Sequence, residues 1–259
     1  MTSTDLGLTV AFSLVVLVNL VGNGVVCVVV LKYRGMRGPI NFLLVNLAVS
    51  DMIVALFITP VYVIKWAFHH PSGVAGDYLC RFITGGNLIW VGGAVSAFSL
   101  VVVAVERYFA VVHPLGDGWK LNNRRLTAVV ITSWLYGVLF NLPLFFVARY
   151  DGDGVFNCPE HWSDKHLAKV YTIACFFVFG AIPMGAMAFL YLKMLGNLWK
   201  SQGDRNTQVF EQARIRSRLK VTKMVAVVSI MYTVCWLPNL VLYMLSQFRP
   251  DLYEYGSVP

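Results

Sequence analysis

Long apolar stretches separated by short polar connections run through most of the chain. The apolar stretches occupy about 7–31, 39–64, 81–112, 126–148, 167–195 and 221–245. Each is long enough to cross a bilayer as a helix, and a helix satisfies its own backbone polar groups where lipid offers no partner. The short segments of alternating polarity that build a membrane β-barrel do not occur in the sequence. The pattern therefore predicts an all-α fold, a polytopic helical bundle that forms a single membrane domain over residues 1–259.

The distribution of charge gives this bundle an orientation in the membrane. Charged residues make up only 13% of the chain, about half the share found in a soluble domain. Fourteen of the 21 Lys and Arg residues lie in or beside the connections near 32–38, 113–125 and 196–220. Because basic loops stay in the cytoplasm, the amino terminus is expected outside, with the first span retained. The net charge of +8 is then a sign of topology, and no nucleic-acid partner is predicted.

Two of the five cysteines fall outside the interiors of the apolar stretches. Cys80 comes just before the third stretch, and Cys158 lies in the connection between the fourth and the fifth. Both belong to the outer, oxidising side of the predicted bundle, so a disulfide between them is expected. Two free thiols are the alternative.

Ionisable residues inside the spans are few, and membrane proteins concentrate their function in such residues. Asp51 lies in the middle of the second stretch with no basic residue near it in sequence. It is expected to be protonated and hydrogen-bonded, hydrated, or paired with a cation, and Asn23 of the first stretch is a polar partner at similar depth. Glu106 and Arg107 end the third stretch, where, taken alone, they are typical of a pair at the membrane interface.

These residues belong to a longer ordered set that resembles the rhodopsin-like (class A) G-protein-coupled receptors. The other members of the set are Asn46, Tyr108, Trp134, Pro183, Tyr191, Trp236 and Pro238. The resemblance covers nearly the whole chain. It implies the receptor fold, with six of its seven transmembrane helices present, in the plasma membrane.

The resemblance also implies a switch at the inner end of the bundle. Arg107, held by Glu106 and followed by Tyr108, is expected to meet a heterotrimeric G protein in the active state, with Tyr191 swinging towards it. The kink at Pro238 would let the sixth span move outward, because proline removes a backbone hydrogen bond.

The same resemblance assigns the remaining residues of the set. Asp51 with Ser96 is similar to an inner sodium site, and this sodium ion is the only metal or cofactor implied. Trp236 is similar to an aromatic lever in the sixth span. Asn46 and Trp134 are similar to a pair that ties the second span to the fourth. Asn23 and Pro183 are expected to be structural.

Two features of the spans depart from the family pattern, a spacing and a single residue. The spacing from Cys80 to Arg107 is about two residues longer than usual, and Gly85–Gly86 and Gly92–Gly93 lie in between. A bulge or a shifted outer turn is therefore expected. Tyr232 stands where the family usually carries a phenylalanine.

A third departure is the end of the chain, which reaches Pro259 without a seventh apolar stretch. We interpret the chain as a fragment, an incomplete gene model or a cut product. A genuine six-span isoform that does not signal by itself is the alternative.

The outer connection between the fourth and fifth spans indicates a class of ligand. No acid lies between Cys80 and Glu106, which disfavours a small amine. The connection over 151–162 resembles the Cys-x-Glu-x-Trp loops of several neuropeptide receptors, and its acids would attract a cationic peptide. We predict a receptor for a neuropeptide, with these candidate contacts: Asp151, Asp153, Glu160 and Trp236.

Other functions are less favoured by the sequence. A class A receptor for a non-peptide ligand remains an alternative. A transporter is disfavoured because no internal repeat is found. An enzyme is not predicted, since the chain has neither Gly-x-Ser-x-Gly nor His-Glu-x-x-His.

Overall fold

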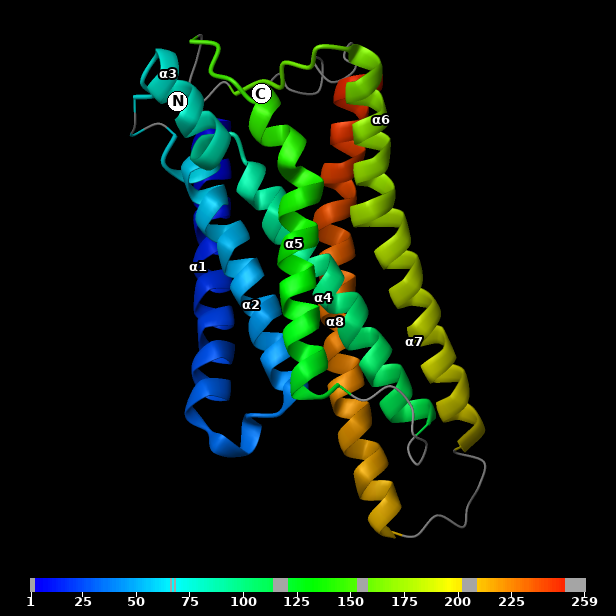
Figure 1. Cartoon of the computed structure of the whole chain (residues 1–259). Coiled ribbons are helices and arrows are strands. Elements are labelled where there is room, and N and C mark those ends of the chain that lie inside the picture. The colour runs from blue at the N-terminus through cyan, green and yellow to red at the C-terminus, as the bar shows by residue number, and fades with distance from the viewer. Residues whose placement is uncertain are drawn as a thin grey trace.

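Long helices run the whole height of the molecule (Figure 1). The computed structural model describes residues 3–65, 67, 69–113, 121–152, 158–201 and 209–249, without the side chains of 198–219 and 221. Within these residues, six helical stretches are long and apolar enough to cross a membrane. They are Ser3–Lys32, Pro39–Val63, Gly73–Val112, Asn123–Val147, Lys165–Asn197 and Thr222–Phe248. The predicted all-α membrane fold is confirmed.

Several of these stretches consist of more than one helical element. The helices are α1 (Ser3–Lys32), α2 (Pro39–Ile58), α3 (Gly73–Leu79), α4 (Asn87–Val112), α5 (Asn123–Val147), α6 (Lys165–Cys175), α7 (Ile182–Ser201) and α8 (Val209–Phe248). The shorter elements are the 3-10 turn η1 (Arg34–Met36) and the π-helical turns η2 (Thr59–Val63), η3 (Cys80–Thr84) and η4 (Phe176–Ala181). The spans are thus interrupted near the end of the bundle that carries α3. We call this end the outer end and the opposite one the inner end.

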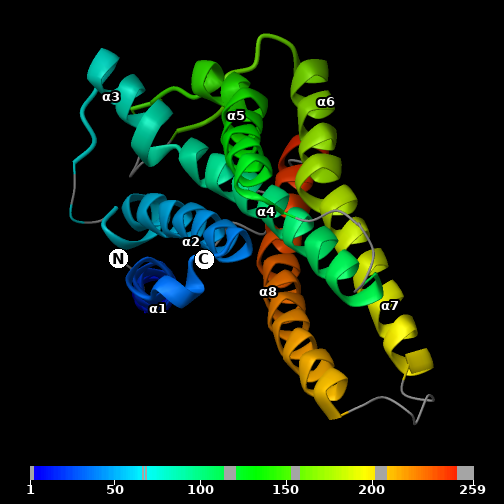
Figure 2. The same cartoon turned by 60° about the horizontal axis from the view of Figure 1, so that its bottom comes forward.

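Helix α4 lies at the centre of the bundle (Figure 2) and packs against α2, α5, α7 and α8. Glycines allow the close approach of its neighbours. A Cβ atom on Gly92 would press on Val54 of α2, and one on Gly137 of α5 would press on Val95. Small residues at such crossings matter in a bilayer, where lipid is as apolar as the helices and packing itself drives their association.

The outer start of α4 absorbs the long spacing between Cys80 and Arg107. The π turn η3 closes through a hydrogen bond from Gly85 N to Cys80 O, at 2.9 Å. Gly86 then takes a left-handed backbone with φ of 75°, which glycine adopts without steric cost, and α4 begins after it. The predicted third span, 81–112, is therefore a π turn and a helix joined by a bend, as the extra residues and the glycine pair indicated.

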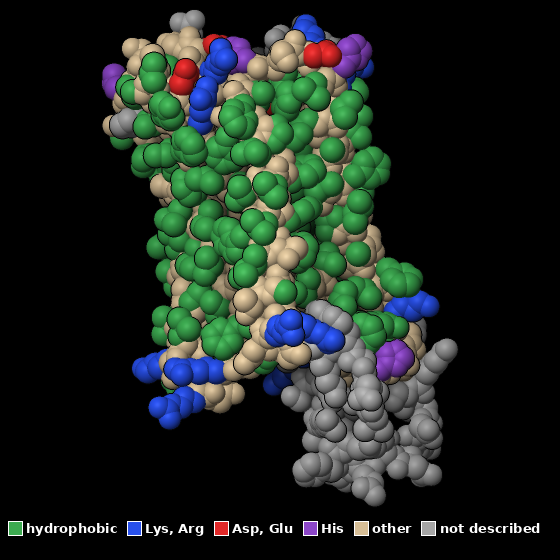
Figure 3. All heavy atoms as spheres, in the orientation of Figure 1, with side chains coloured by type: hydrophobic (Ala, Val, Ile, Leu, Met, Phe, Trp, Pro, Cys, Tyr) green, Lys and Arg blue, Asp and Glu red, His purple; other side chains and the backbone are tan. Residues whose placement is uncertain are grey.

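The side of the molecule is apolar and its two ends are polar (Figure 3). Large apolar side chains cover the middle of the visible face, and Val18 of α1 is 72% exposed. Lys and Arg side chains are visible at both ends, whereas the visible Asp and Glu side chains lie at the outer end. This arrangement fits a protein whose middle lies in hydrocarbon.

Candidate functional site

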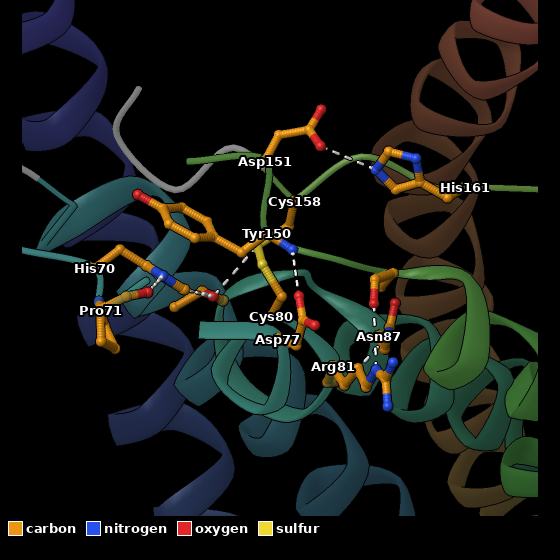
Figure 4. The surroundings of a disulfide bond; sticks show 12 residues. His70, Pro71, Asp77, Cys80, Arg81, Asn87, Tyr150, Asp151, Cys158 and His161 are labelled. Carbon is orange, nitrogen blue, oxygen red and sulfur yellow. Dashed lines mark hydrogen bonds and ion pairs between the residues drawn. A yellow bond between two sulfur atoms is a disulfide. The ribbon is translucent and has the colours of Figure 1, made fainter. Parts of the chain in front are cut away.

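A disulfide joins the third span to the outer connection (Figure 4). It links Cys80, which is fully buried at the start of η3, to Cys158, and their Cα atoms are 5.6 Å apart. The predicted disulfide is confirmed. Two hydrogen bonds accompany it: Tyr150 N donates to Asp77 Oδ1 at 3.0 Å, and Arg81 Nε donates to Ala148 O at 3.3 Å.

The connection after α5 folds back on itself beside this disulfide. His161 N donates to Val147 O at 2.8 Å, and Arg149 N donates to Pro159 O at 3.3 Å. This short antiparallel pairing places Glu160 opposite the end of α5. The side chain of His161, the next residue, therefore points away from the side on which Glu160 lies.

The predicted acidic contacts of this connection lie in different surroundings. Asp151 is exposed and its Oδ1 is 3.2 Å from His161 Nε2, so its charge is partly met within the connection. Asp153 lies outside the described residues. Glu160 points into the bundle.

Glu160 is held between two aromatic donors. Trp162 Nε1 donates to Oε2 at 2.6 Å, and the Tyr243 hydroxyl lies 3.0 and 3.1 Å from the two carboxylate oxygens. Burial raises the pKa of the Glu160 carboxyl above its ordinary value, although the bonds from Trp162 and Tyr243 oppose this by stabilising the charged form. Tyr243 belongs to α8, so this acid links the outer connection to the sixth span.

A row of aromatic rings leads from this acid into the bundle. The Trp90 ring on α4 lies 5.3 Å from that of Tyr243 and 5.7 Å from that of Trp236, between centroids. Trp236 in turn stacks on Tyr232, one turn away on α8, at 5.9 Å. Gly93 makes room for the Trp236 indole, because a Cβ atom there would overlap its six-membered ring.

Asp51 lies lower in the bundle, beside a cavity of about 260 Å³. Ser96 Oγ donates to Asp51 Oδ1 at 2.5 Å, so the structure brings the predicted pair together. Asn23 is not brought to Asp51: its amide donates to Asn19 O and Oδ1, at 3.1 and 3.2 Å. Asn19, one turn earlier on α1, lines the cavity together with Asp51 and Trp236.

The structure brings the second and fourth spans together at Asn46. Trp134 Nε1 donates to Asn46 Oδ1 at 2.9 Å, while the Asn46 amide donates to Ser99 Oγ of α4 at 2.9 Å and lies 3.4 Å from Ser133 Oγ. Three helices therefore share one buried polar cluster.

At the inner end, the Arg107 guanidinium pairs with the Glu106 carboxylate on the same helix. Their side chains are 12% and 15% exposed, so the pair is largely shielded from water. Tyr191 is not at Arg107, because its hydroxyl lies 3.1 Å from Ser229 Oγ of α8. A cavity of about 250 Å³ opens beside Tyr108. Its other lining residues are Val112, Leu192, Lys193, Gly196 and Asn197.

Prolines lie in the fifth and sixth spans, at the start of α7 and inside α8. Pro183 is buried directly after η4, at the second residue of α7, and Pro238 lies inside α8, two residues after Trp236. Each lacks the N–H that a helix would use at that position.

Comparison with known proteins places this arrangement in a family. The family model described as 7 transmembrane receptor (rhodopsin family) matches residues 22–256. The chain belongs to this family.

Individual relatives of this rhodopsin-family chain carry receptor names. Neuropeptide receptor 22 of Caenorhabditis elegans is 28% identical over 250 residues, which are 92% of this chain and 57% of that receptor. QRFP-like peptide receptor of Branchiostoma floridae is 30% identical over 237 residues, with 88% and 61% covered. Substance-P receptor of Cavia porcellus is 30% identical over 250 residues, with 94% and 59% covered. The chain thus spans between 57% and 61% of the length of these relatives.

Sequence reasoning missed three residues of this rhodopsin-family site. Tyr243 follows Trp236 by seven residues, two helical turns, so it shares a face with it, and this signal was available. Trp90 and Gly93 are one turn apart on α4, but an aromatic and a glycine in an apolar stretch are also typical of helix packing. Only the fold shows that they meet Trp236.

Proposed function

We propose that this rhodopsin-family protein binds a cationic neuropeptide outside the cell and activates a heterotrimeric G protein inside it. The observation that carries the ligand class is the carboxylate of Glu160, held at the outer end by Trp162 and Tyr243. Relatives whose names denote neuropeptide, QRFP-like peptide and substance-P receptors support a peptide ligand.

The chemistry around Glu160 suits a guanidinium or an ammonium group. A carboxylate can accept about four hydrogen bonds, and two donor groups leave capacity for an arginine of the ligand. Such charge-assisted pairs are strongest when bidentate. The rings of Trp162 and Tyr243 beside the acid add an electrostatic attraction for the same cation. An amidated peptide that carries arginine is the ligand we favour.

The orientation of the chain follows the same proposal, with the amino terminus outside and the protein in the plasma membrane. A disulfide at the outer end supports this, because disulfides form in oxidising compartments. Helix α1 begins at that end (Figure 1). At the opposite end, Lys and Arg side chains are visible without Asp or Glu beside them (Figure 3), in keeping with the positive-inside rule.

Activation is proposed to be a shift between two arrangements of α8. A ligand bound at Glu160 would contact the acid that accepts a hydrogen bond from Tyr243 of α8. The Trp90 ring contacts both the Tyr243 ring and the Trp236 ring, so the three rings connect Glu160 to Trp236. The ligand would favour the arrangement in which the inner end of α8 has moved outward. The size of this shift is limited by how much more tightly the ligand binds that arrangement than the resting one. Arg107 would then leave Glu106 and meet the G protein.

A sodium ion is proposed to favour the resting arrangement from the cavity beside Asp51. The Asp51 carboxylate and the Ser96 hydroxyl offer oxygen ligands 2.5 Å apart, and Asn19 lines the same cavity. The residues fit a hard cation, since an acid in the middle of a span with no basic residue near it in sequence needs a counter-charge or a proton.

A binding measurement tests the ligand class. A fluorescent amidated peptide with one arginine should bind Glu160→Gln at least tenfold more weakly than the parent protein, about 1.4 kcal/mol. Asp164→Ser is the matched control, because it removes an outer acid yet leaves a residue able to cap α6. Equal affinity in the parent and Glu160→Gln would overturn the proposal. Nucleotide exchange on an added G protein tests the coupling separately.

A further inference from the structure

Pro183 cannot supply the N–H that a helix at this position would offer to one of two preceding backbone carbonyls. An α-helical N–H at position 183 would serve Phe179 O, and a π-helical one would serve Val178 O. The π pattern is present at the preceding residue, where Ile182 N donates to Phe177 O. Proline has no N–H, so neither carbonyl receives a bond from position 183.

Tyrosine hydroxyls from two other helices reach these carbonyls. The Tyr232 hydroxyl of α8 donates to Phe179 O at 2.9 Å, and the Tyr136 hydroxyl of α5 lies 3.5 Å from Val178 O. Tyr232 is only 7% exposed and Phe179 is 1% exposed. A carbonyl at this depth has no water to bond, so losing its partner costs free energy.

The two tyrosines sit on helices that differ in their freedom. Helix α5 is bonded to α2 through Trp134 and Asn46. Helix α8 is the element proposed to move. Any displacement of α8 along or away from η4 at the level of Tyr232 stretches the bond to Phe179 O, whereas the contact of Tyr136 is unaffected.

We infer that the Tyr232 hydroxyl is a positioning group that latches α8 to η4 and holds the resting arrangement. It substitutes for the backbone donor that Pro183 lacks, and a phenylalanine at position 232 could not do so. Because Tyr232 also stacks on Trp236, a shift of that indole and release of the latch are one event. The role in signalling rests on the proposed function, but the latch itself can be measured without a G protein.

Tyr232→Phe removes the hydroxyl alone, and Tyr136→Phe is the matched control at the adjacent carbonyl. Spin labels at Arg34→Cys and Lys223→Cys report the inner end of α8, in a background carrying Cys27→Ala and Cys235→Ala, in lipid nanodiscs. In Tyr232→Phe the population with α8 displaced should rise between about twofold and tenfold, the range of one neutral hydrogen bond. In Tyr136→Phe it should stay as in the parent.

A second variant separates the latch from a general loss of packing. Pro183→Ala restores a backbone N–H beside the two carbonyls, so Tyr232→Phe should displace α8 less in that background than alone. The parent, the two single variants and the double variant form a double-mutant cycle that measures the coupling between the hydroxyl and the restored N–H. If Tyr232→Phe alone folds poorly, recovery of folding when Pro183→Ala is added is the readout of the same coupling. An unchanged distance distribution in Tyr232→Phe, an equal shift in Tyr136→Phe, or a cycle without coupling would each overturn the latch.

The outcome is distinguishable from that of the proposed function. If the labels move but no variant stimulates nucleotide exchange with or without peptide, the latch stands and the coupling to a G protein fails. If peptide stimulates exchange and Tyr232→Phe does not move the labels, the latch fails and the receptor function stands.

Discussion

The outer and inner ends of the bundle are held together by different means. At the outer end, the Cys80–Cys158 disulfide, the paired connection after α5 and the Glu160 to Tyr243 bonds link different helices. At the inner end, the ion pair of Glu106 and Arg107 stays within α4. Among the described side chains at that end, a hydrogen bond between Tyr191 of α7 and Ser229 of α8 joins two helices.

This difference supports the proposed opening of α8 at its inner end. Moving α8 at the outer end requires breaking the bonds of Tyr243 to Glu160. At the inner end, the described part of α8 packs through apolar side chains such as Val225, which shares a cluster with Leu43 and Val103. A helix pinned at one end and packed at the other can pivot, which is one of the common forms of conformational switching. The outer end would keep the shape of a ligand site while the inner end changes.

The largest effect is expected from removing the outer cross-link. Cys80→Ser with Cys158→Ser should lower the free energy of unfolding by about 2–5 kcal/mol, because the disulfide closes a long loop in the unfolded chain. Thermal unfolding in detergent measures this. Cys235→Ser, which changes an exposed free cysteine, is the control and should unfold near the parent temperature. Equal unfolding of the double variant and the parent would mean that other outer contacts suffice.

The next effect tests the middle of the bundle, between the two ends. Asn46→Ala should cost about 1–3 kcal/mol of unfolding free energy, because it leaves the Trp134 N–H without its acceptor and removes the amide that donates to Ser99 Oγ. Asn23→Ala is the control, since its amide bonds only Asn19 of its own helix. Thermal unfolding should separate the two variants. Similar losses would show that the cluster does not connect the helices energetically.

A smaller effect is expected from pH at the outer end. Burial raises the pKa of Glu160, so this acid takes up its proton at a higher pH than an exposed glutamate, whose pKa is about 4.3. The charged form is present above the raised pKa, and the affinity for a cationic peptide should therefore fall as the pH drops through it. Peptide titrations at several pH values measure the change.

Two variants assign this pH dependence to one residue. Glu160→Gln should bind weakly and equally across the same pH range, because no carboxylate remains to titrate. His161→Gln should keep the dependence, although this histidine pairs with Asp151 in the same connection. A flat profile in His161→Gln would transfer the effect from Glu160 to the histidine.

The contrast between the ends also explains how far the sequence could be interpreted. The lengths of the apolar stretches alone predict six spans, because a helix that crosses the hydrocarbon of a bilayer needs about twenty mostly apolar residues. The partners of Cys80 and Glu106 could be predicted because each residue has few possible partners. Cys80 has one other cysteine on the outer side, and Glu106 has an arginine next to it in sequence. These predictions concern residues whose environment is set by the membrane or by the chain itself.

The rest depends on how helices turn against each other. Asn19 lines the cavity of Asp51. Asn23 lies on the same face of α1 one turn further on, so a shift of α1 along its axis by about one turn would exchange them. Glu160 turns inward because of the pairing at Ala148, and such a register within a loop leaves no periodic signal. The latch of Tyr232 needs the break at Pro183 to lie beside it, which only the packed bundle shows.

The smallest effect is expected at the inner ion pair. Glu106→Gln removes the charge but keeps the size of the side chain and an oxygen that can accept from Arg107 Nε. The unfolding free energy should therefore change by about 1 kcal/mol or less. Basal nucleotide exchange on an added G protein should rise severalfold, because Arg107 is held less firmly by a neutral neighbour. Lys223→Gln, at an exposed position of α8, is the control and should leave exchange unchanged. If Glu106→Gln leaves exchange unchanged while Tyr232→Phe raises it, the inner end is held by packing and by the bond of α8 to η4. The ion pair would then only shield Arg107 until α8 has moved.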